Sequence, residues 1–533
     1  MNRLYYGDCL TIMRDHLPLG SVDLVYLDPP FNSNRDYNAI YKDETGLPLP
    51  DQVEAFNDLW ELSEERQRAI RMMPVLMRDA GLDDDIVEFW KIWMNALRGT
   101  QPRLLAYLSY MTERLLPLRG IVKPTGSIYL HCDPTASHYI KVMMDGIFGH
   151  KNFRNEIIWK RSNPKSLGTI NLPNGTDTIL RYTRGDKAVF HQPYEEHDPK
   201  YVALAYRHRD ERGAYRLLPL LNPNDDRPNL NYEFLGVKRV WRWTKERMQK
   251  AYDDGVVVQV RPGAVPQYKK YLEDSKGRTL TNCWTDIPQV GGNEALGYPT
   301  QKPTALLERI IKMSSNKGQV VFDPFCGCAT TIEAAHKLGR QWIGIDIAIH
   351  AIKRVAKVRL EDRIGLQEGA DFVIEGVPQT LEGARDLWER DKYQFQKWAI
   401  EQVDGFVTSK RTADGGIDGR LYFSMPNAPD LQSMVIEVKG GDSVGIENVR
   451  SLRGVLNRDR ALMAGLIIMN DLGPRKTANF RREMGDAGDL DVNGVLYPRM
   501  QMLTVPEIIG GKRFLTPTVA RGRGLAQPRL PLG

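Results

Sequence analysis

The chain has 533 residues, of which 42% are hydrophobic and 26% charged, and its formal net charge at pH 7 is +6. This length exceeds one ordinary core, so we expect several domains, and the composition excludes a disordered protein. The apolar runs are too short to span a bilayer, and the N-terminus lacks a secretory hydrophobic region. Five scattered cysteines suit a reducing cytoplasm, where we expect the protein, and the basic balance weakly favours a polyanionic partner.

The first stretch with a chemical signature is "DLVYLDPPF", in which an apolar strand runs into an acidic residue and two prolines. Consecutive prolines end a strand, because each fixes φ and removes a hydrogen-bond donor. Asp28, Pro29, Pro30 and Phe31 therefore follow the carboxyl end of a strand, where open α/β sheets bind ligands. They present a carboxylate, a rigid backbone carbonyl and an aromatic face.

The next elements are a helical region, "RLLAYLSYMTERLLPL", and a second buried strand, "GSIYLHCD", in which we expect His131 to be a hydrogen-bonded structural residue. "DTILRYTRGDKAVFH" predicts a hairpin that turns at residues 184–186. Residues 195–290 then lose this regularity. Their stretches "VWRWTKERMQKAY" and "QYKKYL" interleave aromatic and basic residues, which suits contacts to phosphates and base edges and equally suits a solvated helix face.

A β-α-β unit follows, "QVVFDPFCGCATTIEAAHKLGRQWIGIDI". The chain leaves a strand at Asp323, turns through small residues at 327–329 and enters a helix, whose N-terminus offers unpaired N–H groups to a ligand. Asp346 ends the next strand, where a carboxylate can accept both hydroxyls of a ribose. This pattern predicts a nucleoside site. No P-loop motif occurs, and the C-x-C of Cys326 and Cys328 indicates small-residue packing rather than a metal site.

Taken together, these elements resemble the β group of DNA amino-methyltransferases, over residues 1 to about 362. In that family Asp-Pro-Pro-Phe is the catalytic motif, and "DPFCGCATT" resembles the motif D-P-F-x-G-S-G-T-T, which binds S-adenosyl-L-methionine. Ala329 replaces the last glycine of that motif; it is small enough for binding to survive, although a positive φ there is disfavoured. "TQKP" resembles the element beside the methionine end of the cofactor, and Asp8 of "YYGDCL" matches an acid that hydrogen-bonds the adenine amine.

The resemblance implies specific roles for the matching residues. The implied cofactor-binding residues are Asp8, Lys302, Pro303, Asp323, Phe325, Gly327, Cys328, Ala329, Thr330 and Asp346. The implied catalytic residues are Asp28, Pro29, Pro30 and Phe31, which would hold the exocyclic amine of a flipped base and stack on it. In this group Asp at the first motif position usually marks N6-adenine methylation and Ser marks N4-cytosine methylation, so adenine in double-stranded DNA is the expected target and N4-cytosine the alternative.

The C-terminal part holds a second constellation, "DGGIDGRLYF" followed by "MVIEVKGG". Asp418 begins a strand, and Glu437 and Lys439 share one face of the next strand, because side chains two residues apart point the same way. Two carboxylates can hold a divalent cation such as Mg²⁺ while a lysine orients the attacking water. These residues resemble the PD-(D/E)xK core of Mrr-like restriction endonucleases, over residues 385 to about 510, with Glu401 as an additional acidic candidate.

We therefore expect an α/β protein: a Rossmann-like methyltransferase with an inserted target-recognition region, followed by an α/β restriction-endonuclease-like domain. The expected boundaries are residues 1–364 for the methyltransferase, with the insertion at about 160–295, 365–384 for a linker, 385–512 for the nuclease domain and 513–533 for a basic tail. Such a chain would be a restriction–modification enzyme acting on double-stranded DNA. The alternative is a solitary methyltransferase whose C-terminal domain only binds DNA. A homodimer and a separate restriction subunit both stay open as partners.

Overall fold

The computed structural model describes most of the chain and leaves out several loops and the C-terminal end. The described residues are 2–30, 60–163, 170, 172–296, 300–349, 351–408, 416–425, 432–441, 443–459 and 461–517. The chain divides into two compact units, one formed by Met1–His191 with Asn282–Gly533 and the other by Gln192–Thr281. In the part that is described, no helix combines the length and the apolar character needed to cross a membrane.

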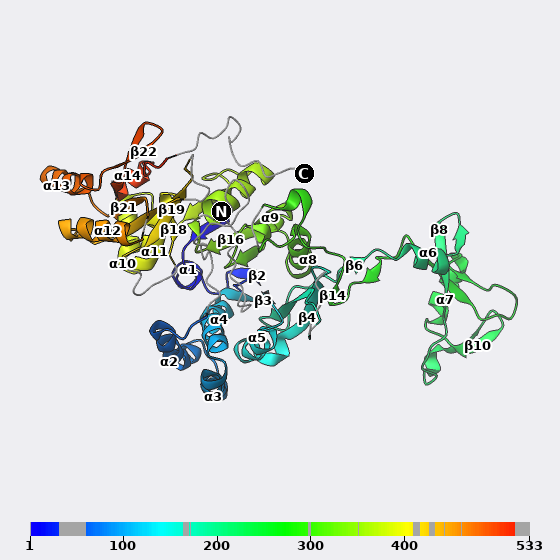
Figure 1. Cartoon of the computed structure of the whole chain (residues 1–533). Coiled ribbons are helices and arrows are strands. Elements are labelled where there is room, and N and C mark those ends of the chain that lie inside the picture. Colours follow the sequence, from blue (N-terminus) through cyan, green and yellow to red (C-terminus); the bar gives the residue numbers. More distant parts are fainter. Residues whose placement is uncertain are drawn as a thin grey trace. The chain divides into compact units, whose positions relative to one another are not determined.

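A nine-stranded sheet forms the centre of the first unit (Figure 1). In sheet order its strands are β14 (Cys283–Trp284), β4 (Phe153–Lys160), β5 (Thr176–Thr183), β3 (Val122–Cys132), β2 (Val22–Leu27), β15 (Val320–Asp323), β16 (Gln341–Asp346), β1 (Asn2–Tyr6) and β17 (Phe372–Glu375). The strands from β3 to β17 are parallel neighbours, whereas β5 runs antiparallel to β3 and β4. Every residue of β2 is buried, as expected of a parallel strand covered on both faces.

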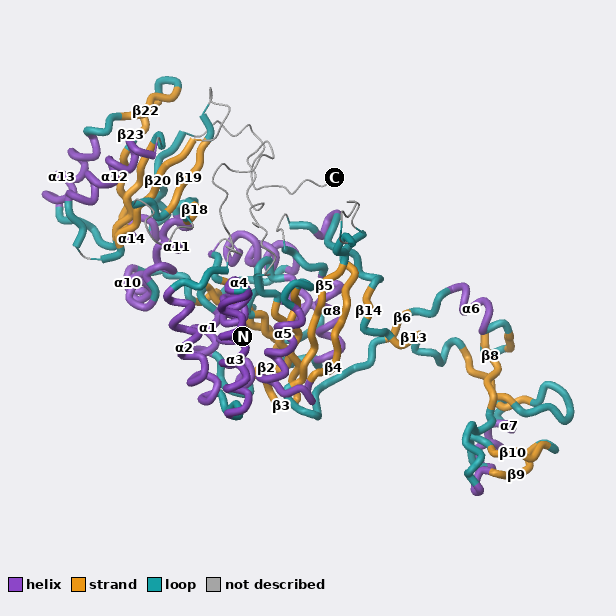
Figure 2. The backbone as a smooth tube through the Cα atoms, turned by 60° about the horizontal axis from the view of Figure 1, so that its bottom comes forward, coloured by secondary structure: helices purple, strands orange, loops and turns teal. Residues whose placement is uncertain are grey.

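Helices cover this sheet (Figure 2). They are α1 (Cys9–His16), α2 (Glu64–Asp79), α3 (Asp84–Thr100), α4 (Pro102–Ile121), α5 (Ser137–Met144), α8 (Thr304–Ser314) and α9 (Thr330–Lys337). Most of α4 is buried, because α2 and α3 pack against it and all three belong to one apolar core. The β-α-β unit predicted from the sequence is confirmed as β15, α9 and β16, with the two strands parallel.

The hairpin predicted to turn at residues 184–186 is wrong. β5 ends at Thr183 and pairs with β3 and β4, which lie on either side of it in the sheet. The chain after the turn forms no strand; instead the amide of Val189 donates to the carbonyl of Thr125 (3.0 Å). Local alternation suggested a partner strand nearby in sequence, whereas β5 takes both of its partners from strands that precede it.

The C-terminal part builds a second, five-stranded sheet with its own apolar cluster. Its strands, in order, are β18 (Phe406–Val407), β19 (Gly419–Phe423), β20 (Gln432–Lys439), β21 (Met463–Ile468) and β24 (Met500–Thr504). The accompanying helices are α10 (Leu381–Arg390), α11 (Lys392–Gln402), α12 (Ile446–Asp459), α13 (Pro474–Gly485) and α14 (Val505–Ile509).

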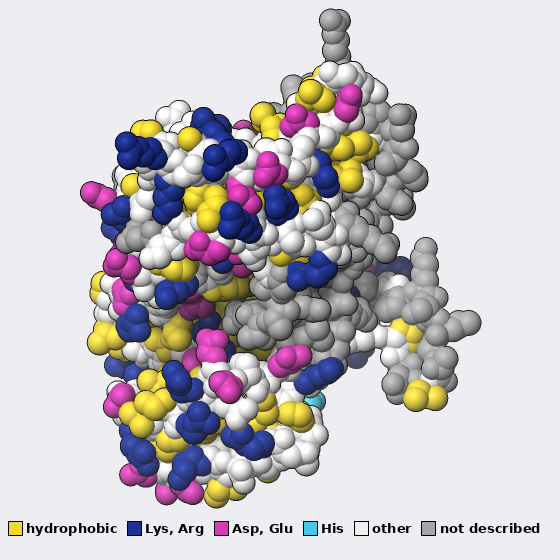
Figure 3. Space-filling model, turned by 60° about the vertical axis from the view of Figure 1, so that its left-hand side comes forward, with side chains coloured by type: hydrophobic (Ala, Val, Ile, Leu, Met, Phe, Trp, Pro, Cys, Tyr) yellow, Lys and Arg dark blue, Asp and Glu magenta, His cyan; other side chains and the backbone are white. Residues whose placement is uncertain are grey.

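On the face shown in Figure 3, basic side chains are interspersed with acidic ones and form no single basic patch among the residues drawn in colour.

The unit Gln192–Thr281 replaces the expected irregularity with short strands. Its main sheet has the order β11 (Val257–Val258), β12 (Gln267–Tyr271), β8 (Gly213–Pro219) and β7 (His208–Asp210). Trp241 is fully buried in a small core and donates its indole N–H to the carbonyl of Tyr232 (2.8 Å). The aromatic residues of the stretch "VWRWTKERM" thus serve partly as core, while the basic ones of α7 (Lys245–Asp253) are mostly exposed.

Candidate active site

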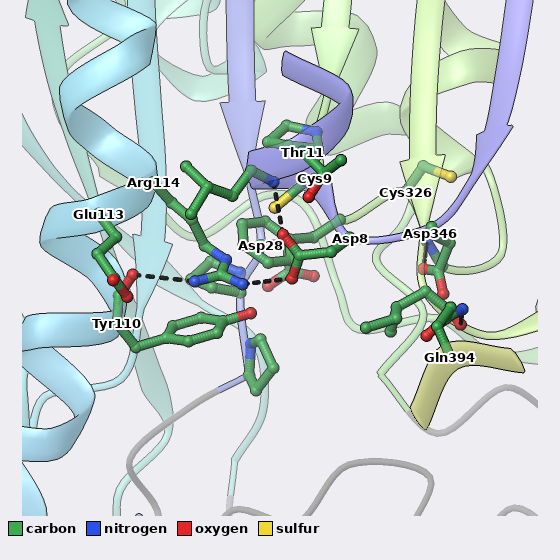
Figure 4. Close-up of a pocket in the computed structure, with 18 of the residues that line it drawn as sticks. Asp8, Cys9, Thr11, Asp28, Tyr110, Glu113, Arg114, Cys326, Asp346 and Gln394 are labelled. Carbon is green, nitrogen blue, oxygen red and sulfur yellow. Dashed lines mark hydrogen bonds and ion pairs between the residues drawn. The ribbon is translucent and has the colours of Figure 1, made fainter. Parts of the chain in front are cut away.

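Four acidic side chains emerge at one edge of the central sheet. β1, β16, β15 and β2 are parallel neighbours, so their carboxyl ends meet, and Asp8, Asp346, Asp323 and Asp28 lie at or just beyond those ends. All four border one cavity of ≈ 1600 Å³ (Figure 4). This placement is the one expected of a ligand site in an open α/β sheet.

Most of the residues predicted from the sequence line this cavity. They are Asp8, Asp28, Pro29, Pro30, Lys302, Asp323, Phe325, Gly327, Cys328, Thr330 and Asp346. Ala329 and Pro303 are buried; the first directly precedes α9 and the second directly precedes α8. Phe31 lies outside the described residues. The structure therefore brings the stretches "DPP", "TQKP" and "DPFCGCATT" together in space.

Asp28 is held by a cation from a distant part of the chain. The ammonium group of Lys302 lies 2.5 Å from Asp28 Oδ2, although 274 residues separate the two positions. Both side chains are largely buried: 15% of the Asp28 side chain and 10% of the Lys302 side chain are exposed. Lys302 precedes α8, and its neighbour Gln301 is fixed by a hydrogen bond from the amide of Leu296 (2.8 Å). The "TQKP" stretch thus positions a charge beside the carboxylate of the "DPP" stretch.

The glycine-containing turn is fastened by two carboxylates. Asp346 Oδ2 accepts a hydrogen bond from the amide of Gly327 (2.8 Å), and its Oδ1 accepts one from Ala348 (2.8 Å). Asp323 Oδ1 accepts the amide of Phe325 (3.0 Å). Burial raises the pKa of both carboxyl groups, that of Asp323 to about 7. Because each oxygen of Asp346 has a second lone pair, the carboxylate can hold the turn and still accept a ligand hydroxyl.

Ala329 adopts a backbone conformation that suits glycine better. Its φ of 60° and ψ of 30° lie in the left-handed region, directly before the first residue of α9. A Cβ atom in this region costs roughly 1–2 kcal/mol. The small side chain fits sterically, but the backbone takes the positive φ that the sequence analysis described as disfavoured. The turn is therefore strained at this position and is held by its surroundings.

Arg359 is a part of those surroundings that the sequence analysis missed. It is fully buried and belongs to the π-helical segment η6 (Arg359–Arg363). Its Nη1 donates to the carbonyl of Cys328 (2.8 Å) and to the hydroxyl of Thr330 (2.7 Å), and its Nε pairs with Glu333. This guanidinium therefore holds the turn through hydrogen bonds to the two residues that flank Ala329. A signal for it was the acidic Glu333 in an otherwise apolar stretch of α9.

Asp8 also has a partner that the sequence did not reveal. Its Oδ1 caps α1 by accepting the amide of Leu10 (2.7 Å), and its Oδ2 lies 2.5 Å from Arg114 of α4. The guanidinium of Arg114 lies over the ring of Tyr110, 3.5 Å from its centre, and Figure 4 shows both side chains beside Asp8. The cavity wall at this end consequently combines an aromatic face with a fixed ion pair.

A buried polar network includes Tyr26, which lies two residues before Asp28 at the end of β2. His131 is fully buried, as predicted for a structural histidine, and lies within hydrogen-bonding distance of the Tyr26 hydroxyl through Nδ1 (2.8 Å) and of Asp177 through Nε2 (3.1 Å). Arg161 donates to the other oxygen of Asp177 (2.9 Å). Burial opposes the charge of Asp177, but the hydrogen bond and charge of His131 and the charge of Arg161 hold its pKa below the ordinary value. The imidazole of His131 therefore connects Tyr26 of β2 to Asp177 of β5.

The C-terminal residues predicted for a nuclease also come together. β19 pairs antiparallel with β20 so that Gly419 faces Ile436, which places Asp418 opposite Glu437. Asp418 Oδ2 accepts the amide of Val438 (2.7 Å), and Lys439 lies 2.6 Å from Glu437 Oε1. Glu437 is 5% exposed, and its Oε2 is buried without a hydrogen-bond partner in the described structure.

Glu401, in contrast, does not belong to this cluster. Its carboxylate accepts the amide of Ile349 (3.0 Å), which follows β16 of the central sheet. The helical pattern of the sequence does not show whether Glu401 faces the candidate nuclease strands or the segment after β16, and in the structure it faces the latter. Within the described ranges, no group of three or more His, Cys, Asp or Glu side chains is arranged to hold a metal ion.

Known proteins resemble the chain over this same region. The model of a DNA methylase family matches residues 22–357. The type II methyltransferase M.EcaI of Enterobacter cloacae is 31% identical over 296 residues, which are 54% of this chain and 65% of that protein. The StyLTI Mod subunit, from a type III restriction-modification enzyme of Salmonella typhimurium, is 29% identical over 362 residues, 64% of this chain and 50% of that protein. The chain thus spans half to two thirds of the length of these relatives.

Among solved structures, TTHA0409 from Thermus thermophilus in complex with S-adenosyl-L-methionine is 16% identical and covers 70% of this chain and 98% of that one. Its TM-score of 0.33 is too low to support a conclusion. The family model, however, spans more than half of the chain and includes both the Asp28 strand and the Asp346 strand. On that match, and with the site assembled as described, the chain belongs to the DNA methylase family.

Proposed function

We propose that the protein is an S-adenosyl-L-methionine-dependent DNA methyltransferase that modifies adenine N6 in double-stranded DNA. The observation that carries the proposal is the meeting of the Asp28-Pro29-Pro30 stretch and the turn fastened by Asp346 at a single cavity. One stretch suits an exocyclic amine and the other suits a nucleoside. The family match and the name of the type II methyltransferase relative support DNA methylation, and the choice of adenine N6 rests on Asp28 at the first position of the motif.

The residues present fit this cofactor. Asp346 retains acceptor capacity for ribose hydroxyls, and Asp8 presents a fixed carboxylate at the other side of the nucleoside end. Gly327 and Cys328 bring the turn close to the cavity with small side chains. When bound, S-adenosyl-L-methionine supplies an electrophilic methyl group on a sulfonium. The chain then has to bring a base amine to that methyl group in the correct orientation.

Asp28 and the carbonyl of Pro29 are suited to that task. The lone pair of an exocyclic amine is delocalised into the base. When the two N–H groups of the amine donate hydrogen bonds to fixed acceptors, the lone pair becomes localised on the nitrogen and points toward the methyl group. The two prolines fix the carbonyl, and Lys302 fixes the carboxylate through Oδ2. Such preorganised geometry can lower a barrier by roughly 7–11 kcal/mol. We assign the stacking of the flipped base to Phe31, which lies outside the described residues.

The test is nucleoside mass spectrometry of DNA from a methylation-free host that expresses the protein. We expect N6-methyladenine with the wild type and at least a 100-fold loss with Asp28→Asn, which keeps the shape but removes the charge. Asp15→Asn, an exposed carboxylate on α1, is the matched control and should retain full activity. N4-methylcytosine would overturn the base assignment. Absence of any modified base, with folded and cofactor-binding protein, would overturn the methyltransferase proposal.

A second activity is supported by the buried, unpartnered Glu437 Oε2. We propose that Asp418 and Glu437 bind Mg²⁺ and that Lys439 orients the attacking water, as in the Mrr-like nucleases that this part resembles. Mg²⁺ is commonly held by one or two carboxylates while it keeps several waters, so two protein ligands suffice. This assignment makes residues 385–512 a nuclease domain joined to a methyltransferase. We separately propose that the unit Gln192–Thr281 forms the core of the target-recognition region of the methyltransferase.

Cleavage of unmethylated plasmid in the presence of Mg²⁺ tests this second activity. Glu437→Gln and Lys439→Ala should each abolish cleavage, whereas Glu447→Gln, an exposed glutamate near the start of α12, should not. Methylation should persist in all three variants. Specific DNA binding without cleavage by the wild type would instead support a C-terminal domain that only binds DNA. The Mod subunit relative makes a separate restriction subunit the partner to add in that case.

A further inference from the structure

Helix α11 of the C-terminal part is fastened to the segment that follows Asp346. Gln394, near the start of α11, donates its Nε2 to the carbonyl of Ile347 (3.2 Å), and Glu401, near its end, accepts the amide of Ile349 (3.0 Å). These two side chains are seven residues apart and therefore lie on one face of the helix. They hold the two backbone positions on either side of Ala348, whose own amide donates to Asp346.

The same helix forms part of the wall of the cofactor cavity. Tyr393, Gln394 and Lys397 line it together with Asp346 and Asp8. Figure 4 shows Gln394 beside Asp346, at the end of the cavity away from Arg114 and Tyr110. Gln394 is buried, with 3% of its surface exposed, and Asp391 caps α11 by accepting the backbone N–H of Gln394 (2.9 Å). Burial and the hydrogen bond from Nε2 to the carbonyl of Ile347 therefore place this side-chain amide at the nucleoside end of the site.

The cavity wall continues from α11 into the candidate nuclease strands. Val407 and Thr408 also line the cavity. The amide of Thr408 donates to the carbonyl of Asp418 (3.0 Å), and its hydroxyl donates to the carbonyl of Ile417 (2.7 Å). Two hydrogen bonds from Thr408, one from its amide and one from its hydroxyl, thus connect the cavity wall to the residues that carry the first candidate nuclease carboxylate.

We infer that the C-terminal domain completes the S-adenosyl-L-methionine site through Gln394, so that cofactor binding and the hydrogen bonds of Thr408 to Ile417 and Asp418 stabilise each other. This inference rests on the proposed methyltransferase function. The cofactor stabilises the state in which α11 is docked, and docked α11 in turn raises the affinity for the cofactor, because such coupling is reciprocal. The methyl donor would then act on the nuclease strands as a stabilising ligand as well as a substrate.

Calorimetric titration of the full-length protein with S-adenosylhomocysteine tests the binding half of the inference. Gln394→Ala should weaken binding about 5- to 10-fold, the loss expected for one buried hydrogen bond. Gln396→Ala is the matched control: it removes the same side chain from the same helix, at a position outside the set of described residues that line the cavity. This control should bind within twofold of the wild type.

Amide hydrogen exchange tests the coupling without any substitution. Saturating S-adenosylhomocysteine should slow exchange at the Thr408 amide of the wild type several-fold, with a smaller effect in Gln394→Ala. If the wild type binds the ligand but Thr408 is unaffected, or if Gln394→Ala and Gln396→Ala bind equally, the inference is overturned and the proposed function stands. If the wild type binds neither S-adenosylhomocysteine nor S-adenosyl-L-methionine, the proposed function fails first and the inference fails with it.

Discussion

At the scale of single residues, the site depends on groups held in unfavourable states by their neighbours. Ala329 has a left-handed backbone, Asp323 is a buried carboxyl group, and Arg359 is a charge with no exposed surface. Hydrogen bonds in the turn before α9 offset the energetic cost of these three states. Substitutions at these positions should therefore change the stability of the protein measurably.

Replacing Ala329 with glycine should stabilise the protein. Relief of the left-handed backbone gains roughly 1–2 kcal/mol, and the extra freedom of glycine in the unfolded chain returns roughly 0.5–1 kcal/mol of that gain. We therefore expect a net increase of about 0.5–1 kcal/mol in the free energy of unfolding, seen as a higher melting temperature by calorimetry. Ala334→Gly, at a buried position inside α9, should lower it instead. An equal loss of stability in both variants would contradict this account.

The carboxyl of Asp323 should make stability depend on pH. Burial raises its pKa to about 7, whereas the unfolded chain titrates near 4. The folded state therefore binds more protons between these values, so the free energy of unfolding falls as pH rises from about 4 to about 7. Asp323→Asn cannot ionise and can still accept the amide of Phe325. In urea unfolding at pH 5 and pH 8, the variant should lose about 1–4 kcal/mol less than the wild type; parallel losses would refute the assignment.

At the scale of elements, the site is assembled where strands, turns and helices of distant sequence meet. η6 supports the turn before α9 through Arg359, and the segment before α8 brings Lys302 to the end of β2. The β3 and β5 strands, together with Arg161, supply the rest of the network that includes Tyr26. Each part of the site is therefore held by a contact with a distant element, so removing the contact from one element should shift the other.

The link between η6 and the turn can be tested with a change that keeps the charge. Arg359→Lys retains a cation for Glu333 but cannot donate simultaneously to Cys328 and Thr330 with the guanidinium geometry. We expect cofactor affinity to fall about 10-fold in calorimetric titration. Arg363→Lys, an exposed position of the same segment, should leave affinity unchanged. Unaltered binding in both would mean that the turn keeps its shape without Arg359.

The network that includes Tyr26 should contribute to stability more than to cofactor binding. Tyr26→Phe removes the hydroxyl that pairs with His131 Nδ1 and leaves this buried nitrogen without that hydrogen bond, at a cost of about 1–3 kcal/mol. We expect a lower unfolding midpoint in urea with cofactor affinity within twofold of the wild type. A large loss of affinity with normal stability would place Tyr26 in direct contact with the cofactor instead.

How much of this was predictable depends on the range of the interaction. The β15–α9–β16 unit and the pairing of Asp418 with Glu437 were readable, because a turn, a helix start and strand alternation are local. The contact of Lys302 with Asp28 and the position of Arg359 were not, since composition indicates exposure for a charged side chain and says nothing of a partner far along the chain. Glu401 shows the same limit, because its helix was recognisable and the sheet it contacts was not.

At the scale of the whole molecule, the unit Gln192–Thr281 begins and ends in one short pair of strands, here called its base. β6 (Tyr194–Glu195) pairs antiparallel with β13 (Arg278–Thr279), so both ends of the unit lie side by side. Gly277 has a φ of 101°, and a Cβ there would lie 2.1 Å from the carbonyl oxygen of Glu195, so this base needs glycine. The unit therefore has both a paired start and end and a small core of its own.

Deletion of this unit should therefore separate cofactor binding from DNA recognition. Replacing residues 196–277 with a short Gly-Ser linker joins two neighbouring strand ends, and we expect S-adenosylhomocysteine affinity to stay within twofold of the wild type. Sequence-specific DNA binding in a gel-shift assay should disappear. Retained specificity would place target reading elsewhere in the chain, and loss of cofactor binding would show that the unit supports the central sheet.

The paired base of this unit also has a consequence for inheritance. A segment that enters and leaves at adjacent points, with a core of its own, can be exchanged between genes by recombination at two short stretches. If this unit reads the target sequence, as we propose, such an exchange would alter which sequences are methylated and leave the residues of the cavity unchanged. If cutting and marking share that one reader, as a single chain allows, both specificities would change in the same event, and the host genome would not be left with sites that are cut but unprotected.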